Sequence, residues 1–245
     1  MQLESDPDYL LAIDAGNTRI KWGVHDGGAW RARGAMASSA PDWTVMPAAL
    51  GRAIASNVAG VSVERALGRM CAERGIALDV IRAEREQLGV VNGYGDPRQL
   101  GSDRWAALIA ARHSAPGAML VVNVGTALTV DGLADDGRFL GGLIVPGPGL
   151  MSRALESGTA ALRLAPGAFR EFPLATSDAI ASGAIQACVG AIVRFATAME
   201  AHGMRPRQVL VSGGAAGEIA PHLPMAHSIR ENLVLDGLVL IDRAS

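Results

Sequence analysis

The sequence predicts an α/β protein built from two similar domains, on three observations. The chain has 245 residues, which is long for one compact domain and comfortable for two small ones. Apolar residues make up 49% of the chain and aromatic residues only 4%, as in proteins whose buried strands are aliphatic runs. The pattern that opens the chain also returns near its middle.

The first half is expected to open with a meander of strands. Residues 9–13 form an apolar run closed by Gly16 and Asn17, as when a buried strand enters a tight turn. Residues 19–25 return from that turn, and 29–34 follow a second turn. The remaining pattern predicts helices over 41–51, 61–74 and 102–113 (the last capped by Ser102), strands over 52–58 and 77–81, and a loop over 87–100.

The second half repeats this opening after a boundary at Ser114–Gly117. The stretches LLAIDAGNTRIKWGV and MLVVNVGTALTVDGL share an apolar run, an acid or amide, a Gly, a Thr and a second strand. This weak internal duplication predicts one domain over residues 1–115 and another over 116–245. The later elements are predicted as strands over 118–122, 128–133, 138–145 and 208–211 and helices over 149–157, 178–202 and 233–243, with Ser177 as a cap.

Composition argues against several classes of protein. A net charge of −2 leaves no basic surplus for a nucleic-acid backbone. Cys71 and Cys188 are far apart and the five histidines lack zinc-site spacing, so neither a disulfide framework nor a zinc site is expected. The segment Met1–Asp6 is acidic and polar, unlike a secretory signal, and no stretch approaches the roughly 18 apolar residues of a membrane helix. We therefore expect a soluble cytoplasmic protein without membrane or nucleic-acid partners.

The first candidate site is the turn from Asp14 to Lys21. A glycine between two strands lets the backbone approach a phosphate, and Asn17 and Thr18 add side-chain donors. Lys21 adds a compact positive charge, while Asp14 at the strand end can hold Mg²⁺ directly or through water. The alternative is an ordinary hairpin turn with a solvated lysine.

Two further motifs have related chemistry. Asn123-Val124-Gly125-Thr126-Ala127 lacks the acid and the lysine of the first turn, but Thr126 can donate to a second phosphate. Gly101-Ser102-Asp103-Arg104 stands at a predicted helix start, which favours anions. There Arg104 can grip a carboxylate and Asp103 can accept a proton. Taken alone, the first is also consistent with a plain turn and the second with a plain helix cap.

The glycine-rich segments Gly141–Gly149 and Ser212–Gly214 are equally consistent with ligand approach and with structural bends. The chain contains no G-x-x-x-x-G-K-[ST], so it is not a P-loop enzyme. It contains no G-x-S-x-G hydrolase motif either.

Taken together, the motifs resemble those of type III pantothenate kinases, over nearly the whole chain from Leu11 to the final helix. The resemblance rests on the order Asp-x-Gly-Asn-Thr-x-x-Lys, Gly-x-Asp-Arg, Gly-Thr-Ala-x-Thr-x-Asp and Gly-Gly-x-Ile-x-Pro-Gly. It implies two actin-like (ribonuclease H-like) α/β domains with a nucleotide cleft between them. It also implies a homodimer that phosphorylates pantothenate with ATP, the first step of coenzyme A synthesis, using Mg²⁺ and K⁺ or NH₄⁺.

The same resemblance implies roles for single residues. Asp103 would be the general base, and Arg104 would position pantothenate near the subunit interface. The pantothenate site would comprise Tyr94, Gly101, Ser102, Asp103, Arg104 and Thr176. The ATP site would comprise Asp14, Ala15, Gly16, Asn17, Thr18, Arg19, Ile20, Lys21 and Thr126.

One position departs from the family pattern. The family usually has Asp where this chain has Asn123, and that carboxylate is linked to a bound monovalent cation, so cation dependence is in question here. Two alternative functions stay open: an actin-like kinase or phosphatase for another small alcohol, and a transcription accessory role, because family members are also named Bvg accessory factors. Balanced charge and the lack of a helix-turn-helix signal argue against direct DNA contact.

Overall fold

The computed structural model describes residues 6–47, 50–158 and 166–245. Most of the polar N-terminal segment and positions 48–49 of the helix expected over 41–51 lie outside the described residues. The chain divides into two compact units. Unit 1 combines Met1–Ser114 with Leu233–Ser245, and unit 2 is Ala115–Asn232.

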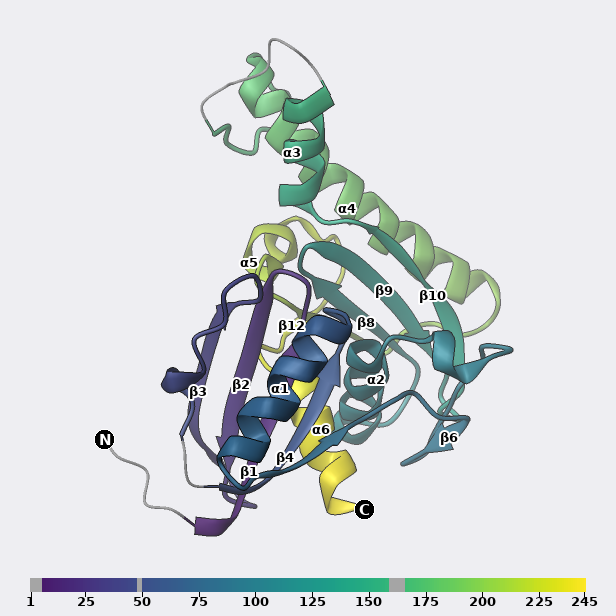
Figure 1. The fold of residues 1–245 in the computed structure, drawn as a ribbon. Coiled ribbons are helices and arrows are strands. Elements are labelled where there is room, and N and C mark those ends of the chain that lie inside the picture. Colours follow the sequence, from purple (N-terminus) through teal and green to yellow (C-terminus); the bar gives the residue numbers. More distant parts are fainter. Residues whose placement is uncertain (1–5, 48–49, 159–165) are drawn as a thin grey trace. The chain divides into compact units, whose positions relative to one another are not determined.

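Unit 1 is a twisted sheet with helices on both faces (Figure 1). The strand order is β3-β2-β1-β4-β5; β2 lies antiparallel to β1 and β3, whereas β4 is parallel to β1 and β5. The elements are β1 (Asp6–Ala15), β2 (Arg19–His25), β3 (Trp30–Ala37), η1 (Trp43–Val45), β4 (Leu50–Asn57), α1 (Val61–Glu73), β5 (Ala77–Val80), β6 (Glu86–Gln87), β7 (Val90–Val91), η2 (Pro97–Gln99), α2 (Ser102–Ser114) and α6 (Leu233–Arg243).

Alternation along β1 separates the two faces of this sheet. Leu11, Ile13 and Ala15 are fully buried in a core that includes Leu67 and Met70 of α1. The residues between them point the other way, toward the face covered by α2 and α6. Asp14 is therefore directed to the α2 side of the sheet at its carboxyl edge.

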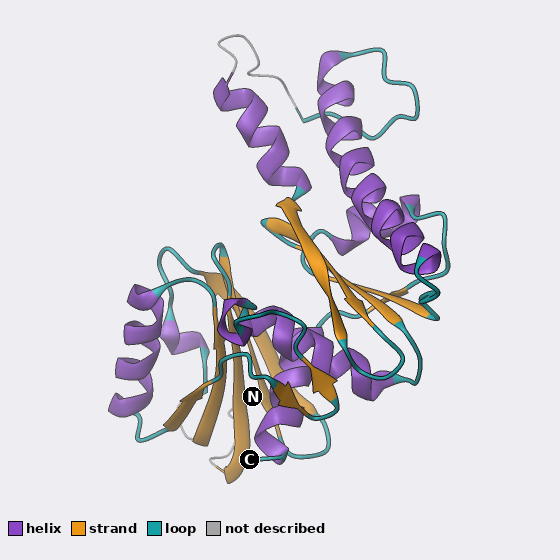
Figure 2. Ribbon diagram, turned by 90° about the vertical axis from the view of Figure 1, so that its right-hand side faces the viewer, coloured by secondary structure: helices purple, strands orange, loops and turns teal. Residues whose placement is uncertain are grey.

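Unit 2 repeats the topology of unit 1, with the order β10-β9-β8-β11-β12. The first three strands again form an antiparallel meander and the next two again add in parallel, which confirms the predicted duplication. Figure 2 shows α3 and α4 running side by side beyond the sheet of this unit. The elements are β8 (Met119–Val124), β9 (Ala127–Leu133), β10 (Phe139–Pro146), α3 (Pro148–Gly158), α4 (Thr176–Ala201), β11 (Gln208–Ser212), α5 (Ala216–Ile219), η3 (Ala220–His222) and β12 (Ser228–Ile229).

The length of α4 corrects one expectation. This helix has 26 residues and is long and apolar enough to cross a membrane, by length and composition only, although no such stretch was expected. Its buried positions include Cys188, Ile192 and Met199, which belong to the core of unit 2 with strands β8 and β9. Part of the apolar character of α4 therefore serves the packing of its own unit.

Four local expectations are wrong. Instead of a helix over 41–51, a single 3-10 turn capped by Asp42 leads to β4 at Leu50, since Pro47 cannot continue the hydrogen bonding of a helix. Ser177 lies inside α4, whose N-cap is Ala175 without a side-chain bond. Ser102 is the first residue of α2 and bonds to β4 rather than capping its own helix. The expected loop over 87–100 also contains β7 and η2.

The final helix lies in unit 1, whereas the sequence placed it in the second domain. Gly237 of α6 meets the backbone carbonyl of Ala106 in α2 so closely that a β-carbon would overlap it. Trp30 Nε1 also donates to Asp236 Oδ1 at 3.0 Å. The close helix contact holds α6 against α2, the helix that starts at the candidate site, and the polar bond holds α6 against β3.

We expect Gly237→Ala to destabilise the protein, because the added methyl group cannot be accommodated between α6 and α2 without moving backbone. Overpacking of this kind costs about 1–3 kcal/mol in the free energy of unfolding, measured by urea denaturation. Gly68→Ala in α1 is the matched control. A β-carbon at Gly68 meets nothing within 4 Å, so that variant should be neutral or more stable. Equal effects in both variants would contradict the role given to Gly237.

Candidate active site

Three polar side chains stand in register at the carboxyl edge of the unit 1 sheet. Asp14 on β1 pairs with Lys21 on β2 and with Ser56 on β4. Directly paired residues on neighbouring strands project to the same face, so the three form one row. Lys21 is the only lysine among the 22 lysine and arginine residues of the chain.

Hydrogen bonds within its own backbone and from Ser38 stabilise the turn between β1 and β2. Gly16 N–H donates to the Arg19 carbonyl at 3.1 Å, and Ser38 Oγ–H donates to the Gly16 carbonyl at 2.6 Å. Asn17 and Thr18 are exposed at the tip, where they can meet a ligand. Ala15 and Ile20, which belong to the same motif, are fully buried in the core. Those two positions can offer a ligand only their backbone.

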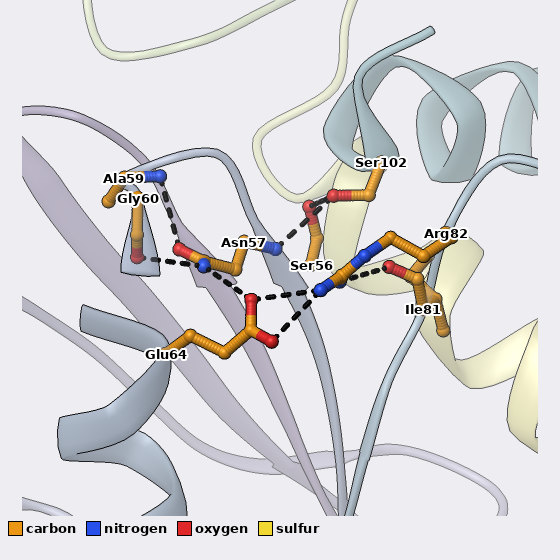
Figure 3. A network of polar contacts seen from close by, with 8 residues as sticks. All are labelled: Ser56, Asn57, Ala59, Gly60, Glu64, Ile81, Arg82 and Ser102. Carbon is orange, nitrogen blue, oxygen red and sulfur yellow. Dashed lines mark hydrogen bonds and ion pairs between the residues drawn. The ribbon is translucent and has the colours of Figure 1, made fainter. Parts of the chain in front are cut away.

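Figure 3 shows how the end of β4 fixes the start of α2. Ser56 Oγ and Ser102 Oγ are 2.9 Å apart in a buried contact, and Asn57 N–H donates to Ser102 Oγ at 3.2 Å. Ser102 was expected to contact substrate, but its hydroxyl takes part in hydrogen bonds to β4. The contact sets the next residue of α2, Asp103, beside the polar row.

The same network continues away from α2 to Glu64 and Arg82 (Figure 3). Asn57 Nδ2–H donates to Glu64 Oε2 at 3.0 Å, and Arg82 donates to both carboxylate oxygens at 2.9 Å. These hydrogen bonds, that of Asn57 first, lower the pKa of Glu64. Glu64 is therefore ionised, and its hydrogen bond from Asn57 supports the turn after β4.

Asp103 lies half-buried at the N-terminus of α2. Its Oδ1 accepts the Arg104 N–H at 2.8 Å. Burial raises the pKa of Asp103, although the Arg104 N–H and guanidinium oppose the rise. A raised pKa makes Asp103 a stronger base once it has lost its proton.

Asp14 and Asp103 influence each other. Burial is the main cause that raises the pKa of Asp14 from 3.8 to about 7; the Asp103 charge adds to the rise and Lys21 opposes it. The two neighbouring carboxylates lie beside two cationic side chains, since Lys21 acts on Asp14 and Arg104 acts on Asp103. A pair of carboxylates fits Mg²⁺, which is usually held by one or two carboxylates together with substrate phosphates.

Tyr94 and Arg104 meet on the same unit. Arg104 Nη1–H donates to Tyr94 Oη at 3.3 Å, and the guanidinium carbon lies 5.9 Å from the centre of the tyrosine ring. Arg104 is only 5% exposed, so its charge is held in one place. The structure thus brings Tyr94, Gly101, Asp103, Arg104 and Asp14 together on unit 1.

Unit 2 has an analogous but uncharged edge. Asn123 on β8 pairs with Thr129 on β9 and with Ser212 on β11, in the places of Lys21 and Ser56. Gly213, with φ +99°, brings its backbone so close that a β-carbon would lie 2.6 Å from Asn123 Oδ1. The position therefore offers neutral oxygens in a confined space.

The other unit 2 positions are set by glycine backbone geometry. Gly147 N–H donates to the Thr126 carbonyl at 2.9 Å, and a β-carbon at Gly147 would overlap the Gly125 carbonyl. Gly141, with φ +109°, lies at a register shift between β9 and β10. Both glycines support the structural interpretation of that segment. Thr176 is exposed at the first residue of α4.

Sequence reasoning missed Ser38, Ser56 and Asn57. For Ser56 and Asn57 the available signal was position, because both lie near the end of the strand expected over 52–58, and polar residues that end neighbouring parallel strands meet at one edge. Ser38 gave no such signal, since it follows its strand by one residue and reaches the turn only through pairing of β2 with β3.

Comparison with known proteins gives consistent matches. The family model described as type III pantothenate kinase matches residues 10–198. A type III pantothenate kinase of Nitrosomonas eutropha is 42% identical, over 96% of this chain and 95% of that protein. Another, from Aromatoleum aromaticum, is 45% identical over 96% of this chain and 98% of that protein.

Solved structures confirm the fold class. A Campylobacter jejuni protein assigned to the Baf family of transcriptional activators superposes with a TM-score of 0.60 at 17% identity, covering 96% of this chain and 98% of that one. A Sinorhizobium meliloti protein assigned as a 2-dehydro-3-deoxygalactonokinase gives a TM-score of 0.60 at 17% identity, covering 96% of each chain. At such identities the likeness concerns the fold alone, which is the two-domain α/β architecture of actin-like sugar kinases.

We expect Asp14→Asn to stabilise the metal-free protein above neutral pH. The folded protein keeps the Asp14 proton up to a pKa of about 7, whereas the ordinary value is 3.8. Wild-type stability should therefore fall as pH rises between those values, and the variant should escape this loss. The gain at about pH 8 should be on the order of 1–4 kcal/mol and should vanish near pH 4.

Urea denaturation with a chelator present, repeated across that pH range, measures the difference. Asp136→Asn is the control, since hydrogen bonds from Arg138 lower the pKa of this exposed carboxyl and its loss should bring no gain at high pH. A pH-independent effect of Asp14→Asn would contradict the raised pKa.

Proposed function

Because this chain belongs to the type III pantothenate kinase family, we propose that Asp14, Asp103 and Arg104 carry out its reaction. The chain is a kinase that phosphorylates pantothenate with ATP in coenzyme A biosynthesis. The observation that supports the residue roles is the pair of neighbouring carboxylates, Asp14 and Asp103, beside Lys21 and Arg104 on one unit.

Asp103 and Arg104 act on pantothenate. The buried Arg104 guanidinium, steadied by Tyr94, binds the pantothenate carboxylate through charge-assisted hydrogen bonds. Asp103, the preceding residue, orients the primary hydroxyl and accepts its proton as the bond to phosphorus forms. Phosphoryl transfer passes through a loose transition state, so the main demands are alignment and charge stabilisation.

The β1–β2 turn acts on ATP. Gly16, Asn17 and Thr18 offer backbone and side-chain donors to the phosphates, and Lys21 offers a compact charge. Asp14 would hold Mg²⁺ together with the phosphate oxygens, and the ion would neutralise charge on the transferred group. Thr126 of the β8–β9 turn supplies a further donor.

A monovalent cation, K⁺ or NH₄⁺, would be held near Asn123. The oxygens available there are neutral, because Thr129 and Ser212 flank Asn123 in register. Neutral oxygens suit a weakly charged ion and bind it less strongly than the carboxylate usual in the family. Cation dependence in this chain is therefore expected at higher salt concentrations than with an aspartate.

The chain acts as a cytoplasmic homodimer through an apolar surface of unit 2. Phe172 is 84% exposed and Leu174 is fully exposed, which is costly in water for a free surface. The segment that carries them is tied to α4, since Asp178 Oδ1 accepts the Ala168 N–H at 2.9 Å and Ser182 Oγ accepts the Arg170 N–H at 2.8 Å. Thr176 follows this segment directly, and in the dimer it would lie near pantothenate.

Asp103→Asn should reduce kcat by about 10²–10⁴-fold, because the amide keeps the shape of the carboxylate and loses its basicity. A coupled assay of ATP consumption with pantothenate measures it, and the KM for ATP should stay unchanged. Asp79→Asn, at an exposed carboxylate on β5, should keep wild-type kcat. Near-normal kcat with a lower melting temperature would instead make Asp103 a helix cap worth about 1 kcal/mol.

The double variant Phe172→Glu with Leu174→Glu should convert the dimer to a monomer of 25.3 kDa, measured by light scattering after size exclusion. Carboxylates buried at the interface would lack cationic partners, and the free energy of removing them from water would oppose dimer formation. The KM for pantothenate should rise at the same time. Val61→Glu changes a 65% exposed side chain of unit 1 and should leave the dimer intact. An unchanged mass of the double variant would refute this interface.

A further inference from the structure

Tyr94 stands on a short segment with little regular structure of its own. The strands β6 and β7 are joined by a tight turn at Leu88 and Gly89, both with positive φ. Residues 92–96 then lead to η2, with glycines on both sides of Tyr94. Flanking glycines leave the backbone many conformations, so a fixed Tyr94 requires contacts that restrict this segment.

Asn92 restricts the segment from inside. It is 2% exposed, and its Nδ2 hydrogens go to the Glu84 carbonyl at 3.1 Å and the Pro97 carbonyl at 3.2 Å. Its Oδ1 accepts the Tyr94 N–H at 3.1 Å. One buried amide therefore joins the two ends of the segment and holds the tyrosine backbone between them.

Arg85 restricts it from outside. Its Nη1 donates to the Tyr94 carbonyl at 2.9 Å and to the Asn92 carbonyl at 3.4 Å, while its Nη2 donates to the Gly95 carbonyl at 2.9 Å. A planar fork that binds consecutive carbonyls fixes a backbone direction, which the single ammonium of lysine cannot do. Tyr94 is thus gripped through both its N–H and its carbonyl.

We propose that Asn92 and Arg85 are positioning residues for pantothenate, which set Tyr94 against the Arg104 guanidinium. Neither side chain need touch the substrate. Both act by keeping the segment in the conformation in which Tyr94 Oη meets Arg104 Nη1 at 3.3 Å. The proposal rests on the assignment of Tyr94 and Arg104 to the pantothenate site.

Arg85→Met keeps an unbranched, flexible side chain and removes the fork. When only a fraction of the protein holds the competent conformation, apparent affinity falls by that fraction. The KM for pantothenate should rise about tenfold, while the KM for ATP and the melting temperature should change little. Arg85→Lys should restore little of the loss, since lysine lacks the fork. Asn92→Ala should act in the same direction, and where it does not fold the arginine variants decide the matter.

Arg74→Met is the matched control. Arg74 also donates to three backbone carbonyls of one loop, those of Trp43, Met46 and Pro47, but to none of residues 92–96. It should leave the KM for pantothenate at the wild-type value. A rise equal to that of Arg85→Met would reduce the effect to general loosening of unit 1 and overturn the proposal.

Tyr94→Ala separates this inference from the assignment beneath it. If Tyr94→Ala alone leaves the KM for pantothenate unchanged, the tyrosine assignment is wrong and the proposal falls with it. If Tyr94→Ala raises that KM but Arg85→Met does not, only the positioning role is wrong. The expected result is that Arg85→Met raises the KM in the wild-type chain and adds nothing in the Tyr94→Ala background, because the two changes remove one interaction. Additive effects would show that Arg85 acts by another route.

Discussion

The buried contact between Ser56 and Ser102 is the joint on which the candidate site depends. It ties the end of a central strand to the first turn of α2, and the next two residues of that helix are Asp103 and Arg104. The sheet fixes Asp14 on the strand next to Ser56, so the contact between the two hydroxyls helps to hold Asp103 near Asp14. Helix α6 packs closely against α2 at Gly237 and so restricts the position of α2 as well.

The burial of Asp14 and Asp103 near each other is electrostatically unfavourable when both carboxyl groups are ionised. Burial and the proximity of Asp103 both raise the pKa of Asp14, against the attraction of Lys21. A fold selected only for stability would not place two carboxylates there, whereas paired carboxylates with raised pKa values are typical of functional sites. Unit 2 keeps the same strand topology with Asn123 at the equivalent place, so the duplicated frame carries charge chemistry in only one copy.

The sequence predicted the regular parts of the fold and the local motifs, and it failed where distant chain segments decide. The strand at 19–25 and the helix at 233–243 have the expected bounds because strong apolar periodicity sets them. The unit to which that helix belongs depends on its contact with Ala106, which leaves no pattern in nearby residues. Asn92 and Arg85 were equally invisible, because they bind backbone carbonyls, and every residue has one. The site motifs were readable because each turn gathers its own chemistry within a few residues.

The polar row contains the only lysine of the sequence, which makes that amine a selective target for chemical labelling. All its other long cationic side chains are arginines, whose guanidinium groups keep their protons and resist acylation. Apart from the chain's amino terminus, an amine-directed reagent therefore has one target, and that target lies in register with Asp14. A tag placed there reports on the β1–β2 turn alone, and shielding of that amine on addition of ATP would test by mass spectrometry whether this turn binds the nucleotide.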